Sequence, residues 1–443
     1  MGKITFLGAG STVFAKNIIG DCMLTPSLCE FEIALYDIDP QRLEDSYNMV
    51  CALNRNINEN RSRITKHLGV ENRKDALRGA TFAVNAIQVG GYEPCTVTDF
   101  EIPKKYGLRQ TIADTTGVGG IFRALRTIPV MEGIARDMEA VCPECLLINY
   151  TNPMAMVTGY MGRFSKIQTV GLCHSVQVCA HTVLKVLDIP FTEPLYENIA
   201  GINHMSWLLE LRNGDGTDLY PEIRRRANLV LEGKMKCEYK DLVRLEYVRR
   251  LGYYVTESSE HSAEYNNFFI KNAYPELIEQ YQIPLDEYLR RCVNNIEEWE
   301  RERPNYISGD ITHKKTYEYA AGLMEAVITD VPMKIGGNVI NRGAIPNLPP
   351  EACVEVACLV NREGVQPCMQ KPLPTICAAM NMTEINVQLL AIEAAIEQKR
   401  DKVYRAVMLD PHASSELTIS KIVDMCDEMM EKHHADGYMP VYH

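Results

Sequence analysis

The sequence predicts an α/β protein with a Rossmann-like N-terminal domain followed by a mixed α+β domain. Two observations support this prediction. In the first half of the chain, short apolar runs alternate with segments of helical periodicity, as in a parallel sheet covered by helices on both faces. In the second half, apolar runs are joined by turns and are followed by long charged helical segments. We therefore predict domains at 1–197 and 198–443.

The individual elements are predicted from apolar runs and from the spacing of apolar residues. In the first half, strands are expected at 4–7, 33–36, 82–87, 146–149 and 169–172, and helices at 13–24, 40–54, 121–141 and 176–187. In the second half, strands are expected at 198–204, 207–211, 353–360 and 364–367, and helices at 382–398 and 414–433. Each strand of the first half ends in polar or glycine residues, where α/β sheets bind their ligands.

Composition and charge exclude several classes of partner. The 443 residues are 46% hydrophobic and 23% charged, without a signal peptide or an apolar run long enough to span a bilayer. A net charge of −12 without a basic patch would repel nucleic acid. The odd number of irregularly spaced cysteines predicts reduced thiols, and we interpret the Cys142–Cys145 pair as packing. We expect a cytoplasmic protein with no nucleic-acid or membrane partner.

A candidate dinucleotide site lies at the end of the first strand. Gly8, Gly10, Ser11 and Thr12 stand between that strand and the next helix, where backbone amides can bind a pyrophosphate. Asp37 ends the second strand and can accept hydrogen bonds from ribose hydroxyls, which favours NAD over NADP. The third glycine of the usual fingerprint is missing. The alternative is a tight turn in a sheet that binds nothing.

A second glycine-rich stretch, 114–120, precedes the helix that carries Arg123 and Arg126. Its glycines would allow the backbone to approach a ligand, but a loop that only requires positive φ explains them equally well. The residues leave both interpretations open.

A candidate metal site combines residues from two strand ends. Cys173 and His174 follow the strand at 169–172, and His204 ends the strand at 198–204. A thiolate and an imidazole can bind one divalent ion and leave positions open for substrate. From spacing alone, however, a Cys and a His so far apart are more often unrelated.

A succession of motifs along the whole chain resembles the family 4 glycoside hydrolases, and within them the α-galactosidase branch that acts on melibiose-type sugars. The family shares its nucleotide-binding architecture with the lactate and malate dehydrogenases. The motifs that carry the resemblance are residues 4–11, 88–93, 114–120, 149–154, 171–176, 201–204 and 260–265.

The resemblance implies roles for single residues. Cys173 and His204 would bind a catalytic Mn²⁺ or similar divalent ion, and Asn152 would lie beside the sugar hydroxyls. Tyr265 falls where the family places its base, and His174 is the candidate acid, at a position where some members carry Asp.

The resemblance also implies a mechanism. NAD would oxidise C3 of the sugar, a base would remove the C2 proton, and the aglycone would be eliminated with the help of an acid. Water would then add to the double bond, and the hydride would return to C3. His261 would support the site, or would be a packed histidine on a loop.

Substrate and class alternatives remain at this stage. Segment 90–100, which corresponds to the phosphate-binding loop of members that cleave 6-phosphosugars, has acids and no Lys or Arg, so an unphosphorylated sugar is favoured. The alternatives are an α-glucuronidase or α-galacturonidase, a 6-phospho-α-glucosidase, a simple NAD-dependent hydroxy-acid dehydrogenase, and a non-catalytic NAD-sensing regulator. The family resemblance implies a homodimer or homotetramer.

Overall fold

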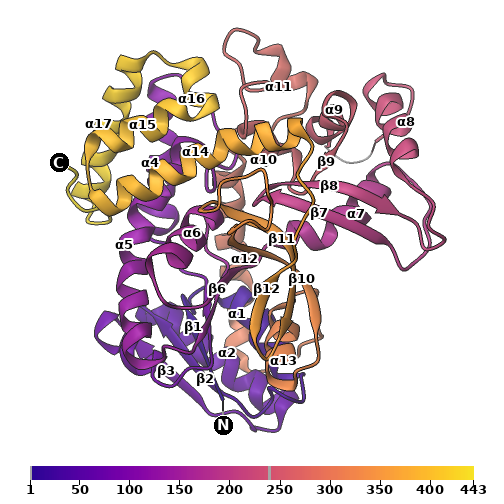
Figure 1. Ribbon diagram of the computed structural model, residues 1–443. Helices are drawn as coiled ribbons and strands as arrows, with labels where there is room; N and C mark the ends of the chain where they lie inside the picture. Colours follow the sequence, from indigo (N-terminus) through magenta and orange to yellow (C-terminus); the bar gives the residue numbers. More distant parts are fainter. Residues whose placement is uncertain (1, 238–240) are drawn as a thin grey trace.

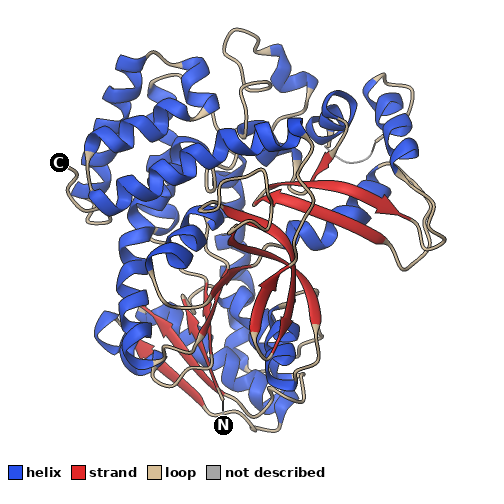
Figure 2. Cartoon of the chain, in the orientation of Figure 1, coloured by secondary structure: helices blue, strands red, loops and turns tan. Residues whose placement is uncertain are grey.

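One continuous sheet organises the protein. The computed structural model describes residues 2–237 and 241–443, and within them twelve strands pair in the order β3-β2-β1-β4-β5-β6-β10-β11-β7-β8-β9, with β12 beside β11. Pairing is parallel from β3 to β6 and antiparallel beyond (Figure 2). The strands are β1 Lys3–Leu7, β2 Glu32–Asp37, β3 Ile64–Leu68, β4 Phe82–Asn85, β5 Leu146–Asn149, β6 Thr169–Gly171, β7 Tyr196–Ile202, β8 Met205–Arg212, β9 Tyr254–Val255, β10 Met333–Ile340, β11 Cys353–Asn361 and β12 Gly364–Pro367.

Helices cover both faces of the parallel strands. Phe6, Phe82 and Ile148 pack with α1, α2 and α13 in one core, whereas Ala83 and Leu147 pack with α5, α6 and α17 in the other. Figure 1 shows where these helices lie. Successive side chains of a strand point to opposite faces, so an unbroken apolar run fills both cores. The helices and helical turns are α1 Thr12–Met23, α2 Pro40–Asn58, η1 Val70–Asn72, α3 Arg73–Leu77, η2 Gly91–Thr96, α4 Val97–Lys105, α5 Gly117–Val141, α6 Met154–Phe164, α7 His174–Val186, α8 Tyr220–Leu231, α9 Leu242–Leu251, α10 Ser259–Glu264, α11 Glu276–Gln280, α12 Glu287–Ser308, α13 Ala320–Thr329, α14 Thr375–Glu397, α15 Arg400–Leu409, α16 Pro411–Glu416 and α17 Ile419–Ala435.

The predicted α/β class and Rossmann-like first half are confirmed, since the parallel strands follow the order 3-2-1-4-5-6. β3 was not predicted because its sequence, Ile-Thr-Lys-His-Leu, belongs to a half-exposed edge strand with little apolar signal. The helix expected at 414–433 is two helices, α16 and α17, because Thr418 caps α17. α14 begins at Thr375, about two turns before the predicted start at 382.

The second half of the chain continues the same sheet. β10 joins β6 through the pair Asn338 and Gly171, and β11 then pairs with β7. This continuity places the ends of β6, β7 and β8 in one region of the molecule. The division into 1–197 and 198–443 remains a prediction.

α14 is the one helix within the described residues that is long and apolar enough to cross a membrane by length and composition. Half of its apolar window is buried in the fold, where α14 packs against α5, α6, α15 and β7. These contacts are those of a core helix.

Two acidic side chains are fully buried near the start of α5. Glu384 of α14 accepts a hydrogen bond of 2.5 Å from Thr116 Oγ1, and Asp410 caps α16 by accepting from the Ala413 amide at 2.7 Å. Burial raises the pKa of Asp410 to about 7 and raises the pKa of Glu384 well above its ordinary value. One oxygen of each carboxyl has no hydrogen-bond partner among the described residues. These acids therefore destabilise the fold when they are ionised.

We predict that the contribution of Asp410 to stability falls as pH rises from 5 to 7. A carboxyl whose pKa is raised by folding binds more protons in the folded chain, so the free energy of unfolding falls between the unfolded pKa, near 3.8 for Asp410, and the folded pKa of about 7. Asp410→Asn should remove about 2 kcal/mol of this fall, measured by urea unfolding under a reductant. Exposed Asp424→Asn is the control, and an unchanged pH dependence in Asp410→Asn would contradict the prediction.

Candidate active site

Three donor groups from separate elements converge beside the end of β6. Cys173 precedes α7, His204 lies between β7 and β8, and Glu257 follows β9. The Cys173 Sγ, a His204 ring nitrogen and a Glu257 carboxylate oxygen all lie within 4.8 Å of one another. The structure thus brings the predicted pair together and adds Glu257, which the sequence analysis did not single out. Its only sequence signal is an acid that follows a short apolar run.

The β7–β8 turn fixes the position of His204. Ile202 pairs with Met205, so Asn203 and His204 form a two-residue turn and do not extend the strand as predicted. His204 has a φ of 63°, which is uncommon for a residue with a side chain, and its surface is 5% exposed. Such a backbone at a buried residue is typical of a functional site.

The donor set fits a divalent transition metal. A thiolate, an imidazole and a carboxylate together suit ions of intermediate softness. His204 Nδ1 is buried and has no hydrogen-bond partner among the described residues, which costs free energy unless a ligand satisfies it. The cluster therefore has the ligand chemistry expected of an ion site, and the ring nitrogen that lies beside Glu257 is His204 Nε2, 3.5 Å from Oε2.

The electrostatics of the cluster also match a cation. Burial, reinforced by the charge of Glu355, raises the pKa of the Cys173 thiol, whereas burial lowers the pKa of His204. Burial would raise the pKa of Glu257, but the imidazoles of His261 and His204 outweigh it and lower this pKa to about 2. The imidazole is therefore neutral and the carboxylate ionised, as ligands must be, and a bound cation would ionise the thiol.

Tyr265 lies directly after α10 and beside the cluster. Its side chain is 1% exposed, and its hydroxyl donates to the backbone oxygen of Asn203 at 3.4 Å. Burial, followed by the charges of Glu384 and Asp114, raises the pKa of Tyr265 well above its ordinary value. A phenolate at this position would therefore require a nearby cation.

His261 of α10 lies within the site and not on a remote loop. Its ring centroid is 4.7 Å from that of His204, with an angle of 77° between the planes. Its Nδ1 is 3.1 Å from Ser258 Oγ, and its Nε2 is 3.9 Å from Asp114 Oδ1. His261 thus connects the cluster to the loop that carries Asp114.

His174 is the first residue of α7 and is half exposed. Its Nε2 lies 2.5 Å from Oε1 of Glu318, and this hydrogen bond raises the pKa of His174 against the effect of burial. The side chain is adjacent to Cys173 in the chain and is accessible to a ligand.

Asn152 faces the loop before α5. Its Nδ2 donates to Asp114 Oδ2 at 2.9 Å. The loop is held from behind by Glu264, which accepts from the amide of Thr111 and from those of Ile112 and Ala113 at 3.1 and 3.0 Å. An amide and a carboxylate are thereby fixed side by side, an arrangement suited to binding sugar hydroxyls.

The glycines of the stretch 114–120 form the first turn of α5, and residues 114–116 form the loop before it. Gly117 has a φ of +68°. A Cβ on Gly119 would lie 2.5 Å from the Ala113 oxygen, and one on Gly120 would lie 2.6 Å from the Thr115 carbonyl carbon. These glycines allow the Asp114 loop to pack directly on the helix, which favours the structural interpretation.

The candidate dinucleotide loop has the expected geometry. Gly8 has a φ of +84°, and a Cβ there would lie 2.8 Å from the backbone of Ala86. The Gly10 amide donates to Asp37 Oδ2 at 2.6 Å, so the acid lies directly against the loop. A Cβ on Gly10 would lie 2.8 Å from Asp37 Oδ2, so both glycines allow the loop to pack closely against neighbouring protein groups.

The start of α1 remains open to an anion. Ser11 is exposed and its side chain does not cap the helix, and the first turn contains no acid. The Thr12 hydroxyl is 2.9 Å from Ser46 Oγ, so that side chain faces the interior. Uncapped amides at a helix N-terminus bind phosphate groups.

Segment 90–100 is helical and not the loop we expected. η2 and α4 cover 91–105, and Asp99 of this segment is buried in a pair with Arg126, at 2.6 Å, and 2.9 Å from His433 Nε2. One of the acids of the segment is therefore part of the core.

Cys142 and Cys145 are both buried free thiols.

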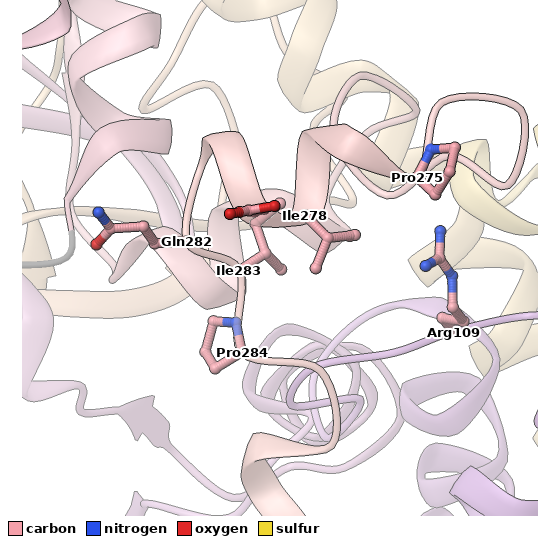
Figure 3. Close-up of a pocket in the computed structure, with 7 residues that line it drawn as sticks. Arg109, Pro275, Ile278, Gln282, Ile283 and Pro284 are labelled. Carbon is pink, nitrogen blue, oxygen red and sulfur yellow. The ribbon is translucent and has the colours of Figure 1, made fainter.

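A cavity of about 540 Å³ lies away from these groups. Figure 3 shows residues that line it, among them Arg109, Pro275, Ile278, Gln282, Ile283 and Pro284. None of the clustered donors contributes to its wall. The candidate active site is thus defined by convergent side chains and not by this cavity.

We predict that Cys173→Ser will weaken Mn²⁺ binding by at least about tenfold, because a hydroxyl is a much poorer ligand than a thiolate. Glu257→Gln should weaken it in the same direction. Equilibrium dialysis under a reductant measures the effect, with exposed Cys368→Ser as the matched control. Unchanged affinity in both site variants would remove the cluster as a metal site.

Two profiles of one protein family match most of this chain. The profile of the Family 4 glycosyl hydrolase matches residues 3–189, and that of the Family 4 glycosyl hydrolase C-terminal domain matches 199–413. An α-galactosidase of Bacillus subtilis (strain 168) is 53% identical over the full length of both chains.

An α-galactosidase of Rhizobium meliloti (strain 1021) is 31% identical over 97% of this chain and 87% of its own. The crystal structure of a 6-phospho-α-glucosidase from gut microorganisms in complex with NAD and Mn²⁺ has the same fold, with a TM-score of 0.80 at 18% identity over all of both chains. This chain belongs to the family 4 glycosyl hydrolases.

Proposed function

We propose that this protein hydrolyses α-galactosides with the help of NAD and a divalent metal such as Mn²⁺. The observation that carries the proposal is the convergence of Cys173, His204 and Glu257 beside Tyr265. The α-galactosidase relative that is 53% identical over both full lengths supports the choice of sugar. We propose the same two domains, 1–197 and 198–443, for the nucleotide and for the metal and substrate.

The nucleotide would lie at the carboxyl ends of β1 and β2. Gly8 and Gly10 allow its backbone approach, Ser11 and the Thr12 amide at the start of α1 receive the pyrophosphate, and Asp37 receives the ribose. NAD, when bound, supplies reversible hydride transfer at C3 of the sugar.

The metal would be held by Cys173, His204 and Glu257, with positions left for sugar hydroxyls. When bound, it supplies a positive charge that polarises a sugar carbonyl oxygen. Asn152 Nδ2 and Asp114 Oδ2 lie 2.9 Å apart, and these two side chains would orient hydroxyls of the sugar ring.

Two side chains would move protons. Tyr265 would take the proton from C2, since the ion that satisfies Cys173 also favours its phenolate against burial. His174, half exposed next to Cys173, would give a proton to the departing oxygen. Elimination, water addition and return of the hydride would complete hydrolysis without net oxidation.

The sugar, the location and the assembly complete the proposal. Segment 90–100 contains no Lys or Arg, which supports an unphosphorylated sugar. A uronic-acid glycosidase is the second candidate, and a hydroxy-acid dehydrogenase is disfavoured because it has no use for the cluster. We also propose a cytoplasmic location, in keeping with fifteen free thiols, and a homodimer or homotetramer.

The decisive experiment is hydrolysis of nitrophenyl α-galactoside by protein stripped with a chelator. We expect activity only when NAD⁺, Mn²⁺ and a thiol reductant are all present, and at least about tenfold more with the galactoside than with the glucoside, the glucuronide or 6-phosphosugars. Turnover without NAD⁺ would refute the mechanism, and steady NADH release without hydrolysis would support the dehydrogenase alternative.

Tyr265→Phe tests the base. We expect exchange of the C2 proton with deuterated solvent to fall by about 10²-fold or more, because the variant has no group to accept that proton. The affinity for NAD should not change. Exposed Tyr274→Phe serves as the control, and undiminished exchange in Tyr265→Phe would remove Tyr265 from this role.

A further inference from the structure

The segment between α12 and α13 is anchored on α1 through a buried carboxylate. Asp21 is fully buried, and it lies 2.8 Å from His313 Nε2, 2.9 Å from the Thr316 amide and 2.5 Å from Thr316 Oγ1. His313 packs against Gly20, where a Cβ would lie 2.5 Å from its ring. Residues 313–316 are therefore fixed to the helix that begins at the dinucleotide loop.

This anchor places Glu318. The Glu318 amide donates to Thr316 Oγ1 at 3.0 Å, which sets the direction of the backbone. The Glu318 side chain is only 8% exposed, and its Oε1 lies 2.5 Å from His174 Nε2. Its other oxygen accepts from the Tyr150 hydroxyl at 3.3 Å. A nearly buried carboxylate thus bonds an imidazole that is half exposed.

Tyr150 supports the same arrangement from the other side. Its ring is 6.2 Å from the His174 ring and 4.7 Å from that of Phe14, which belongs to α1. The carboxylate of Glu318 and the ring of Tyr150 together restrict the imidazole. With Nε2 occupied by Glu318, Nδ1 is the ring nitrogen that remains for a ligand.

We propose that Glu318 is the positioning residue of His174, holding its imidazole so that Nδ1 faces the departing oxygen of the substrate. The inference rests on the proposed function, in which His174 serves the leaving group. A carboxylate that bonds one imidazole nitrogen fixes the tautomer and orientation in which the other nitrogen acts. Nothing in the sequence around Glu318 signals this role.

The test uses leaving groups of different acidity. Nitrophenolate departs without a proton, whereas the oxygen of a sugar or simple alcohol requires one. We expect Glu318→Ala to lower kcat at least about tenfold on methyl α-galactoside and melibiose, and less than about twofold on nitrophenyl α-galactoside. Glu318→Gln, which keeps an oxygen acceptor, should recover part of the loss.

His174→Ala separates this inference from the proposed function. If it shows the same selective loss and the double variant is no worse than His174→Ala, the two residues act as one unit. If His174→Ala lowers kcat equally on both kinds of substrate, or on neither, His174 is not the acid. If His174→Ala is selective and Glu318→Ala is not, only the positioning role is wrong.

Two further variants guard against a trivial loss of folding. Thr316→Val removes the hydroxyl that connects Asp21 to Glu318, and it should reproduce the selective loss in weaker form. Glu325→Gln, on α13, should leave both activities unchanged. NAD affinity should match the parent in every variant, and Tm should fall only in Thr316→Val, which removes a hydrogen bond to the buried Asp21 carboxylate. A loss of activity that is equal for all leaving groups would overturn the proposal.

Discussion

The single constraint on which the site depends is the convergence of three donors that are far apart in the chain. Cys173, His204 and Glu257 follow or join different strands, and their donor atoms come within 4.8 Å only because β6, β10, β11, β7, β8 and β9 belong to one sheet. Any change that separates β6 from β10 would also separate the thiol from the imidazole.

The site is surrounded by buried groups that are costly for folding. Glu264 accepts hydrogen bonds from the amides of 111–113. Glu384 and Asp410 each have one carboxyl oxygen without a hydrogen-bond partner among the described residues. Burial raises the pKa of Glu264 to about 7 despite these amides. The free-energy cost of burying these acids is confined to this region. The same region contains the rigid loop that fixes Asp114 beside Asn152.

Helix α1 connects the proposed nucleotide site with the residues proposed to transfer the proton to the leaving group. Its first turn faces the expected pyrophosphate, while Asp21 near its end anchors 313–316 and thereby Glu318. Phe14 of the same helix packs on Tyr150, which bonds Glu318. The helix therefore supports the nucleotide end and the proton-transferring end of the site in one rigid element.

The sequence by itself determined the α/β class, five of the six parallel strands and the glycine loop with Asp37, because these follow from local periodicity and residue type. It also indicated Cys173 and His204, through motifs that resemble the family. It could not indicate Glu257 or Glu318, whose roles depend on contacts with residues distant in the chain. Only the tertiary structure decided these, since strand pairing and burial bring such residues together, and neither is encoded in local sequence.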